Sequence, residues 1–359
     1  LYFSRRIFIW MNLNVPVAEG AANYAAIFSL GLVFVFMMQN TEHIIRGMGN
    51  TRTPMIITGI SLTLNIALDP LFMFVFGMGL KGAALATLIS QAIGAILMEY
   101  ALIHLSRRYR LCETNSERFH LNHIFRFARI GAPTAFSTAM FSLIYLLLAD
   151  IIARFGDAPL AAIGIGHRIE TIPYFISMGF AMALSTMVGQ NLGAGRPDRV
   201  KESVFVCLKI LSGLMITFSL LMFFFAETLY SFFISDSGII THGIAYLKII
   251  ALFEVFLGFE LVFEGAFSGA GDTQAPMWLI FGGTLFRLPV AYFFAVYWEM
   301  GTEAVWWAIS LSTFIKGSGL AILFKKRLPG WRLLSDQKQQ PKANTETLVV
   351  SQIVNRKVP

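Results

Sequence analysis

The chain has 359 residues, of which 56% are hydrophobic and only 14% are charged, and its mean hydropathy is +0.66. Globular domains carry about 25% charged residues, so this composition argues against a soluble protein and indicates one embedded in a lipid bilayer. The net charge of +7 does not indicate a nucleic-acid-binding protein, because the sequence contains no motif of that class.

Nine stretches with few charges are long enough to cross a bilayer as helices of about 20 residues. In chain order they cover residues 19–41, 54–76, 83–105, 127–153, 160–188, 204–226, 241–266, 277–297 and 304–324. A closed β-barrel also satisfies backbone groups in lipid, but it needs apolar and polar residues to alternate, and here they do not. We therefore predict an all-α fold, a polytopic membrane helical bundle.

Residues 42–55 return 222 residues later as residues 264–277. The residues that recur are Glu42 with Glu264, Gly47 with Gly269, Gly49 with Gly271, Thr51 with Thr273, Pro54 with Pro276 and Met55 with Met277. Such a repeat indicates a duplicated membrane protein. Six spans, an even number, separate the two prolines. We therefore expect two parallel repeats, or lobes, related by a pseudo-two-fold axis along the membrane normal.

The repeat also predicts how the chain is divided. Residues 1–105 would form a partial first lobe, 106–126 an inter-lobe loop, 127–326 a complete second lobe of six helices, and 327–359 a polar tail. The second copy has three helices with no counterpart in the first, and the sequence begins with Leu1. We therefore expect a twelve-helix transporter that lacks its first three helices in this chain.

Lys and Arg residues cluster in some connections and are scarce in others. They gather in residues 106–126, near residue 200 and after residue 324. Because positive charges favour the cytoplasmic side, we predict a multi-pass protein of the cell membrane. The 106–126 loop, the Gly47 and Gly269 turns and the C-terminus would be cytoplasmic. Arg5 and Arg6 do not fit this pattern.

The first candidate site combines Asn65 and Asp69, one helical turn apart, with Thr87 on the next span. An ionisable group at lipid depth is costly unless it faces a cavity or a partner. Carboxylate, amide and hydroxyl oxygens suit a hard cation such as Na⁺, and the carboxylate can also bind a proton. A hydrogen-bond network that only holds the helices together explains these residues equally well.

The remaining ionisable residues at lipid depth are candidates for a substrate cavity or a gate, with buried ion pairs as the structural alternative. They are Glu260, Glu264, Glu42, Arg168, Glu170, Arg287 and Lys316. Glu260 lies deeper than Glu264 and is the candidate for attracting a cationic substrate. Arg168 and Glu170 are two residues apart, so they cannot share a helix face. Arg287 occupies the repeat position of Asn65, which predicts that only the first lobe binds a cation.

Patterns typical of enzymes and cofactor sites are absent from the sequence. Two cysteines and six scattered histidines form no metal-binding pattern. The glycine-rich runs ending at Gly195 and Gly271 lack the Lys-Ser/Thr of a P-loop. We therefore expect no enzyme, no cofactor and no metal beyond a possible Na⁺, and an ion gradient as the source of energy.

Four motifs together resemble the multidrug and toxin extrusion (MATE) family, over residues 16–326. They are residues 82–91 (GAALATLISQ), 130–134 (IGAPT) and 188–195 (VGQNLGAG), and Gly271-Asp272-Thr273 with Pro276. The resemblance implies a two-lobed exporter of cationic, amphiphilic drugs, driven by inward H⁺ or Na⁺ flow. It also implies a first-lobe cation site at Asn65, Asp69 and Thr87. One branch of the family has carboxylates where this chain has Phe141 and Leu257, so the second-lobe site of that branch is in doubt here.

The expected function is therefore exchange of cationic drugs or toxins for H⁺ or Na⁺ by alternating access. The expected partners are these small molecules and the lipid bilayer, without nucleic acid, and the expected state is a monomer. The alternative is a flippase of a lipid-linked precursor from the same wider superfamily. A flippase would need a strongly basic cavity, whereas acidic and basic residues at lipid depth are about balanced.

The topology can be tested by labelling with a membrane-impermeant thiol reagent. In a background with Cys112→Ser and Cys207→Ser, we expect Arg110→Cys and Lys338→Cys both to react from the cytoplasmic side. Reaction of the two positions from opposite sides of the membrane would contradict the predicted topology.

Overall fold

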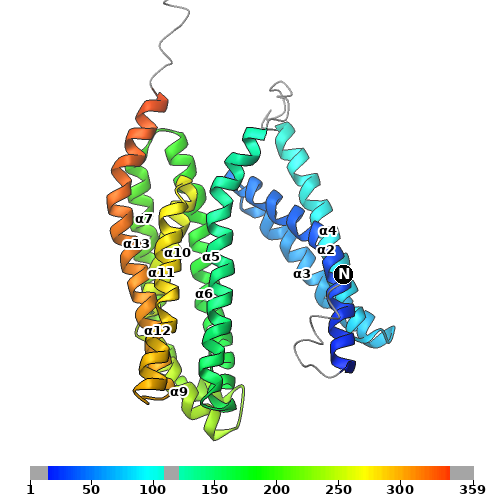
Figure 1. Cartoon of the computed structure of the whole chain (residues 1–359). Coiled ribbons are helices and arrows are strands. Elements are labelled where there is room, and N and C mark those ends of the chain that lie inside the picture. The colour runs from blue at the N-terminus through cyan, green and yellow to red at the C-terminus, as the bar shows by residue number, and fades with distance from the viewer. Residues whose placement is uncertain (1–14, 109–120, 340–359) are drawn as a thin grey trace, which may run out of the picture. The chain divides into compact units, whose positions relative to one another are not determined.

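The computed structural model describes residues 15–108 and 121–339, and within these ranges it contains helices and no strand (Figure 1). The helices are α2 (Val15–Gly47), α3 (Arg52–Pro70), η1 (Leu71–Val75), α4 (Gly79–Arg108), α5 (Leu121–Ala153), α6 (Asp157–Gly193), α7 (Pro197–Phe224), α8 (Ala226–Ser231), α9 (Ser237–Ala251), α10 (Glu254–Ala270), α11 (Gln274–Leu285), α12 (Arg287–Ala291), η2 (Tyr292–Tyr297) and α13 (Thr302–Gln339). This confirms the predicted all-α fold.

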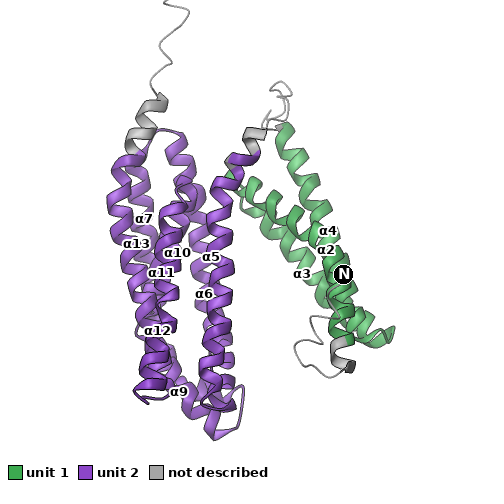
Figure 2. Ribbon diagram, in the orientation of Figure 1, with its two compact units in different colours: residues 1–118 green, residues 119–359 purple. Residues whose placement is uncertain are grey.

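Two compact units divide the chain (Figure 2). Unit 1 is Leu1–Arg118 and unit 2 is Phe119–Pro359, so the boundary falls in the predicted inter-lobe loop. In unit 1, α4 packs along α2 and α3 around a small apolar core that includes Met38, Ile45 and Met98. In unit 2, α10 packs against α6, α7 and α13 and is thereby the central helix.

The sequence repeat reappears as a repeat of backbone geometry. The π-helical segments η1 and η2 lie at matching positions of the two copies, η1 directly after α3 and η2 directly after α12. Positive φ angles also recur 222 residues apart: Gly49 with Gly271, Gly77 with Glu299 and Gly79 with Gly301. Glu299 (φ 53°) is the one non-glycine residue with positive φ among the described residues. Its conformation follows from its place in the repeat, since Gly77 has φ 65° there.

The structure differs from the predicted spans in two details. Eight described helices are long and apolar enough to cross a membrane, because the predicted span 241–266 is divided into α9 and α10 at Leu252 and Phe253. These two residues are apolar, so composition gave no sign of the break. The last helix also continues to Gln339, well into the predicted tail. Trp331 explains part of that extension, since its ring packs edge-on against Phe267.

Helices α6 and α10 approach each other closely at small residues. A Cβ on Gly265 would lie 2.9 Å from Cα of Ala181, and a Cβ on Gly269 would lie 2.9 Å from Cα of Ser185. Small residues four apart on both helices let their backbones meet, as in many membrane helix pairs. This crossing holds α10 in place, and α10 carries three of the four acidic residues that line the cavity described below.

We expect Gly265→Ala to lower the free energy of unfolding by about 1–3 kcal/mol, the usual effect of overpacking. The matched control is Gly282→Ala in α11, where a new Cβ has no neighbour within 4 Å in the described structure. The control should keep the thermal midpoint of the purified protein in detergent unchanged or slightly raised, since alanine favours helix. Equal midpoints for both variants would contradict the close crossing.

Candidate functional site

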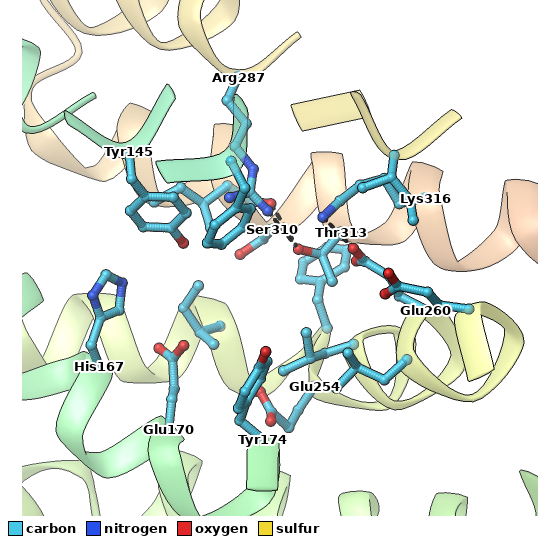
Figure 3. Close-up of a pocket in the computed structure, with 18 of the residues that line it drawn as sticks. Tyr145, His167, Glu170, Tyr174, Glu254, Glu260, Arg287, Ser310, Thr313 and Lys316 are labelled. Carbon is cyan, nitrogen blue, oxygen red and sulfur yellow. Dashed lines mark hydrogen bonds and ion pairs between the residues drawn. The ribbon is translucent and has the colours of Figure 1, made fainter. Parts of the chain in front are cut away.

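A cavity of about 510 Å³ lies inside unit 2 (Figure 3). Its wall is formed by side chains of α5, α6, α9, α10, α11, α12 and α13. Binding pockets for small molecules typically measure about 300–1,000 Å³, so a drug-sized ligand fits. The ionisable carboxylates and cations that line it are Glu170, Glu254, Glu260, Glu264, Arg287 and Lys316, and its aromatic residues include Phe141, Tyr145, Tyr174, Phe175 and Phe253.

Two of the charged residues in the cavity wall form a buried ion pair. Lys316 Nζ on α13 donates to Glu260 Oε1 on α10 over 2.6 Å, and the two side chains are 2% and 9% exposed. The second carboxylate oxygen, Oε2, has no hydrogen-bond partner among the described residues. Sequence reasoning named both residues as candidates but could not place them together.

Arg287 is held by neutral groups. Its Nε donates to Ser312 Oγ (2.9 Å) and one terminal nitrogen donates to Thr313 Oγ1 (3.3 Å). The guanidinium also lies over the ring of Tyr145, 5.4 Å from its centroid, where a cation–π attraction operates. No carboxylate of the described residues lies within ion-pair distance of it. No adjacent carboxylate therefore neutralises Arg287, and its positive charge contributes to the charge of the cavity lining.

Glu254 is a cavity residue that the sequence analysis missed. It is only 1% exposed, and neither carboxylate oxygen has a partner in the described part of the chain. The same holds for Oε1 of Glu170 and Oγ of Ser310, which line the same cavity. Glu254 begins α10 directly after the helix break, which the sequence did not reveal. Its depth in an apolar span was the available signal, as it was for Glu260.

The other candidates lie in three different places. Glu264 lines the cavity one turn beyond Glu260, whereas Arg168 is exposed and does not line it. Glu170 and Arg168 therefore face different surroundings, as their spacing predicted. Glu42 belongs to unit 1 and forms an ion pair with Arg46, one turn along α2.

In unit 1 the structure brings two of the three proposed cation ligands together. Asn65 Nδ2 lies 3.5 Å from Thr87 Oγ1, at the limit of a hydrogen bond. Asp69, one turn from Asn65, has a buried oxygen, Oδ1, with no hydrogen-bond partner from any described residue. Within residues 15–108 and 121–339, no three His, Cys, Asp or Glu side chains are arranged to hold a metal ion. The oxygen atoms that this place offers are those of a carboxylate, an amide and a hydroxyl.

The comparison with known proteins gives similar sequences and similar solved structures. The family model MatE matches residues 1–71 and 133–293. The chain is 32% identical over 332 residues to a probable multidrug resistance protein NorM of Thermotoga maritima, covering 88% of this chain and 68% of that protein. It is 26% identical over 312 residues to a probable multidrug resistance protein YpnP of Bacillus subtilis, covering 86% and 68%. A crystal structure of MATE in the bent conformation has the same fold, with TM-score 0.84, 22% identity and coverage of 93% and 74%.

The cavity carboxylates should differ in their contribution to stability. Glu260→Gln leaves the buried ammonium of Lys316 without a compensating charge, so we expect it to lower the free energy of unfolding by about 3 kcal/mol or more. Glu254→Gln removes a carboxylate that has no described partner, so its effect should stay within about 1 kcal/mol or be stabilising. Thermal unfolding of the two purified variants makes the comparison. A larger loss for Glu254→Gln than for Glu260→Gln would contradict these contacts.

Proposed function

Since this chain belongs to the multidrug and toxin extrusion family, we propose that it exports cationic, amphiphilic compounds in exchange for H⁺ or Na⁺. The observation that carries this proposal is the charge of the unit 2 cavity. Four carboxylates line it against two cationic side chains. Such a lining favours a cation, and its aromatic faces suit a flat, apolar one.

Asp69, Asn65 and Thr87 of unit 1 are our proposed site for the coupling ion. A carboxylate oxygen buried without a partner among the described residues is costly in an apolar setting. Binding a proton or Na⁺ removes that cost, so occupancy of the site can bias which conformation of the protein is stable. Asn65 and Thr87 contribute neutral oxygens that orient the ion beside the carboxylate.

Unit 2 has no equivalent of this site in our proposal. At the repeat positions of Asn65, Asp69 and Thr87 it carries Arg287, Ala291 and Ile309. A fixed guanidinium and two apolar side chains offer no ligand to a second cation. The two lobes would then divide the work, with ion coupling in the first and cargo binding in the second. Alternating access would come from movement of one lobe against the other.

The flippase alternative gains no support from the cavity. A lipid-linked pyrophosphate carries several negative charges and requires a predominantly basic lining. Four carboxylates would repel it. We further propose that the protein is a monomer in the cell membrane, that its C-terminus is cytoplasmic, and that it uses no cofactor.

Coupled efflux should depend on Asp69. In liposomes containing the full-length natural protein, we expect Asp69→Asn to abolish ion-driven export of ethidium, because an amide can neither exchange a proton nor neutralise a cation. Asn65→Ala and Thr87→Val should each weaken export less, since each removes one neutral ligand.

Asp150→Asn is the matched control for this test. Asp150 lies on the membrane helix α5, but its side chain is 74% exposed and pairs with Arg154 at 3.7 Å. The control should keep wild-type export. Full ion-driven export by Asp69→Asn, at normal expression, would rule out the proposed coupling site.

A further inference from the structure

We propose that Glu260 is the subsite for the positive charge of the cargo, and that Lys316 is a built-in stand-in cation that occupies it when the cavity is empty. This rests on the proposed function, because it specifies how that cavity recognises its substrate. The cargo would be an organic cation with apolar groups around the charge. On binding, it would take the place of the Lys316 ammonium beside Glu260.

The Lys316–Glu260 contact has the form of a replaceable pair. Nζ of Lys316 makes one hydrogen bond, to Oε1, within the described residues, although an ammonium has three donors. Oε2 of Glu260 accepts none from that same part of the structure. Buried ion pairs resist separation when further hydrogen bonds satisfy both partners. Here the pair stands without them, in the wall of a cavity large enough for another cation.

Unit 1 shows that this helix crossing does not need the charges. The repeat counterparts of Glu260 and Lys316 are Met38 and Gly94. A Cβ on Gly94 would lie 2.9 Å from the sulfur of Met38, so the same two helices meet at the same point. The contact in unit 1 is apolar, yet α2 and α4 pack closely there. A purely structural role therefore does not explain why unit 2 carries the ion pair.

The space for the lysine is also specific to unit 2. A Cβ on Gly283 would lie 2.5 Å from Cγ of Lys316, so the missing side chain at this position makes room for the lysine stem. Its counterpart in unit 1 is Ser61, whose side chain fills the place beside Gly94. The small and large residues are thus exchanged between the two units. Gly283 thus leaves space for the stem of Lys316, and the lysine side chain lines the cavity.

The rest of the cavity suits an organic cation and offers the displaced lysine a new partner. Figure 3 shows Glu260 beside Lys316. Glu264 lies one helical turn from Glu260 and lines the same cavity. It can accept the ammonium of Lys316 once cargo occupies Glu260. Tyr174 and Phe175 line the cavity with substantially exposed rings, over which a cation with apolar groups can pass.

The test measures binding of tetraphenylphosphonium, a permanent organic cation, to the purified full-length protein. The neutral triphenylphosphine oxide is the matched probe without charge. The variants are Lys316→Met, which removes the stand-in, and Glu260→Met with Lys316→Met, which gives an apolar pair like that of unit 1. Lys209→Met, at an exposed lysine on α7, controls for loss of a positive charge elsewhere.

We expect Lys316→Met to bind tetraphenylphosphonium about tenfold more tightly than wild type, equivalent to 1.4 kcal/mol. The double variant should lose that gain and bind more weakly than wild type, while the neutral probe binds all forms alike. Lys209→Met should match wild type. Should Lys316→Met fail to fold, Lys316→Gln retains a hydrogen-bond donor to Glu260 and should also bind the cation more tightly.

Two results would overturn the stand-in role. One is a folded Lys316→Met or Lys316→Gln protein whose affinity for the cation is equal to or weaker than that of wild type. The other is a double variant that binds the cation as tightly as Lys316→Met. If wild type exports tetraphenylphosphonium under an ion gradient in either case, the proposed efflux stands and only the stand-in fails. If wild type neither binds nor exports the cation, both proposals fail.

Discussion

The free-energy cost of burying charge at lipid depth is the constraint on which this protein depends. Water is absent there, so a charged side chain needs a counter-charge, a set of dipoles or an ion. Unit 2 uses the first two solutions around one cavity and leaves one carboxylate without either. Lys316 has Glu260, Arg287 has two hydroxyls and two aromatic rings, and Glu254 has no partner among the described residues. The charged side chains of unit 2 therefore line one cavity, and a cation that enters it changes their electrostatic energy.

Duplication supplied two copies of one backbone, and substitution gave them different chemistry. The π-helical segments and the positive φ angles match between copies, so the scaffold was retained. The side chains at equivalent points differ in charge: Asn65 corresponds to Arg287, and Gly94 to Lys316. In our account one copy keeps neutral oxygens and a lone carboxylate for a small ion. The other has acquired paired charges around a larger space.

The sequence predicted the helical fold and the repeat because both depend on local patterns. Long apolar stretches indicate membrane helices. Glycine and proline residues that recur at the same positions of both copies indicate turns of the same geometry. The break between α9 and α10 was not predictable, because Leu252 and Phe253 are as apolar as their neighbours. Glu254 lies in the middle of the predicted span 241–266, so its depth was visible in the sequence, whereas its lack of a described partner is a property of the tertiary packing. The Lys316–Glu260 pair joins residues 56 positions apart on different helices, so only tertiary packing reveals it.

In the proposed mechanism, a cation-selective cavity is coupled to an ion gradient. The most direct test of this coupling is transport by the full-length natural protein in liposomes, with H⁺ and Na⁺ gradients imposed separately. Export of tetraphenylphosphonium that rises with one of these gradients, without movement of neutral triphenylphosphine oxide, is the predicted result. Translocation of a lipid-linked pyrophosphate without gradient-driven cation export would contradict the account.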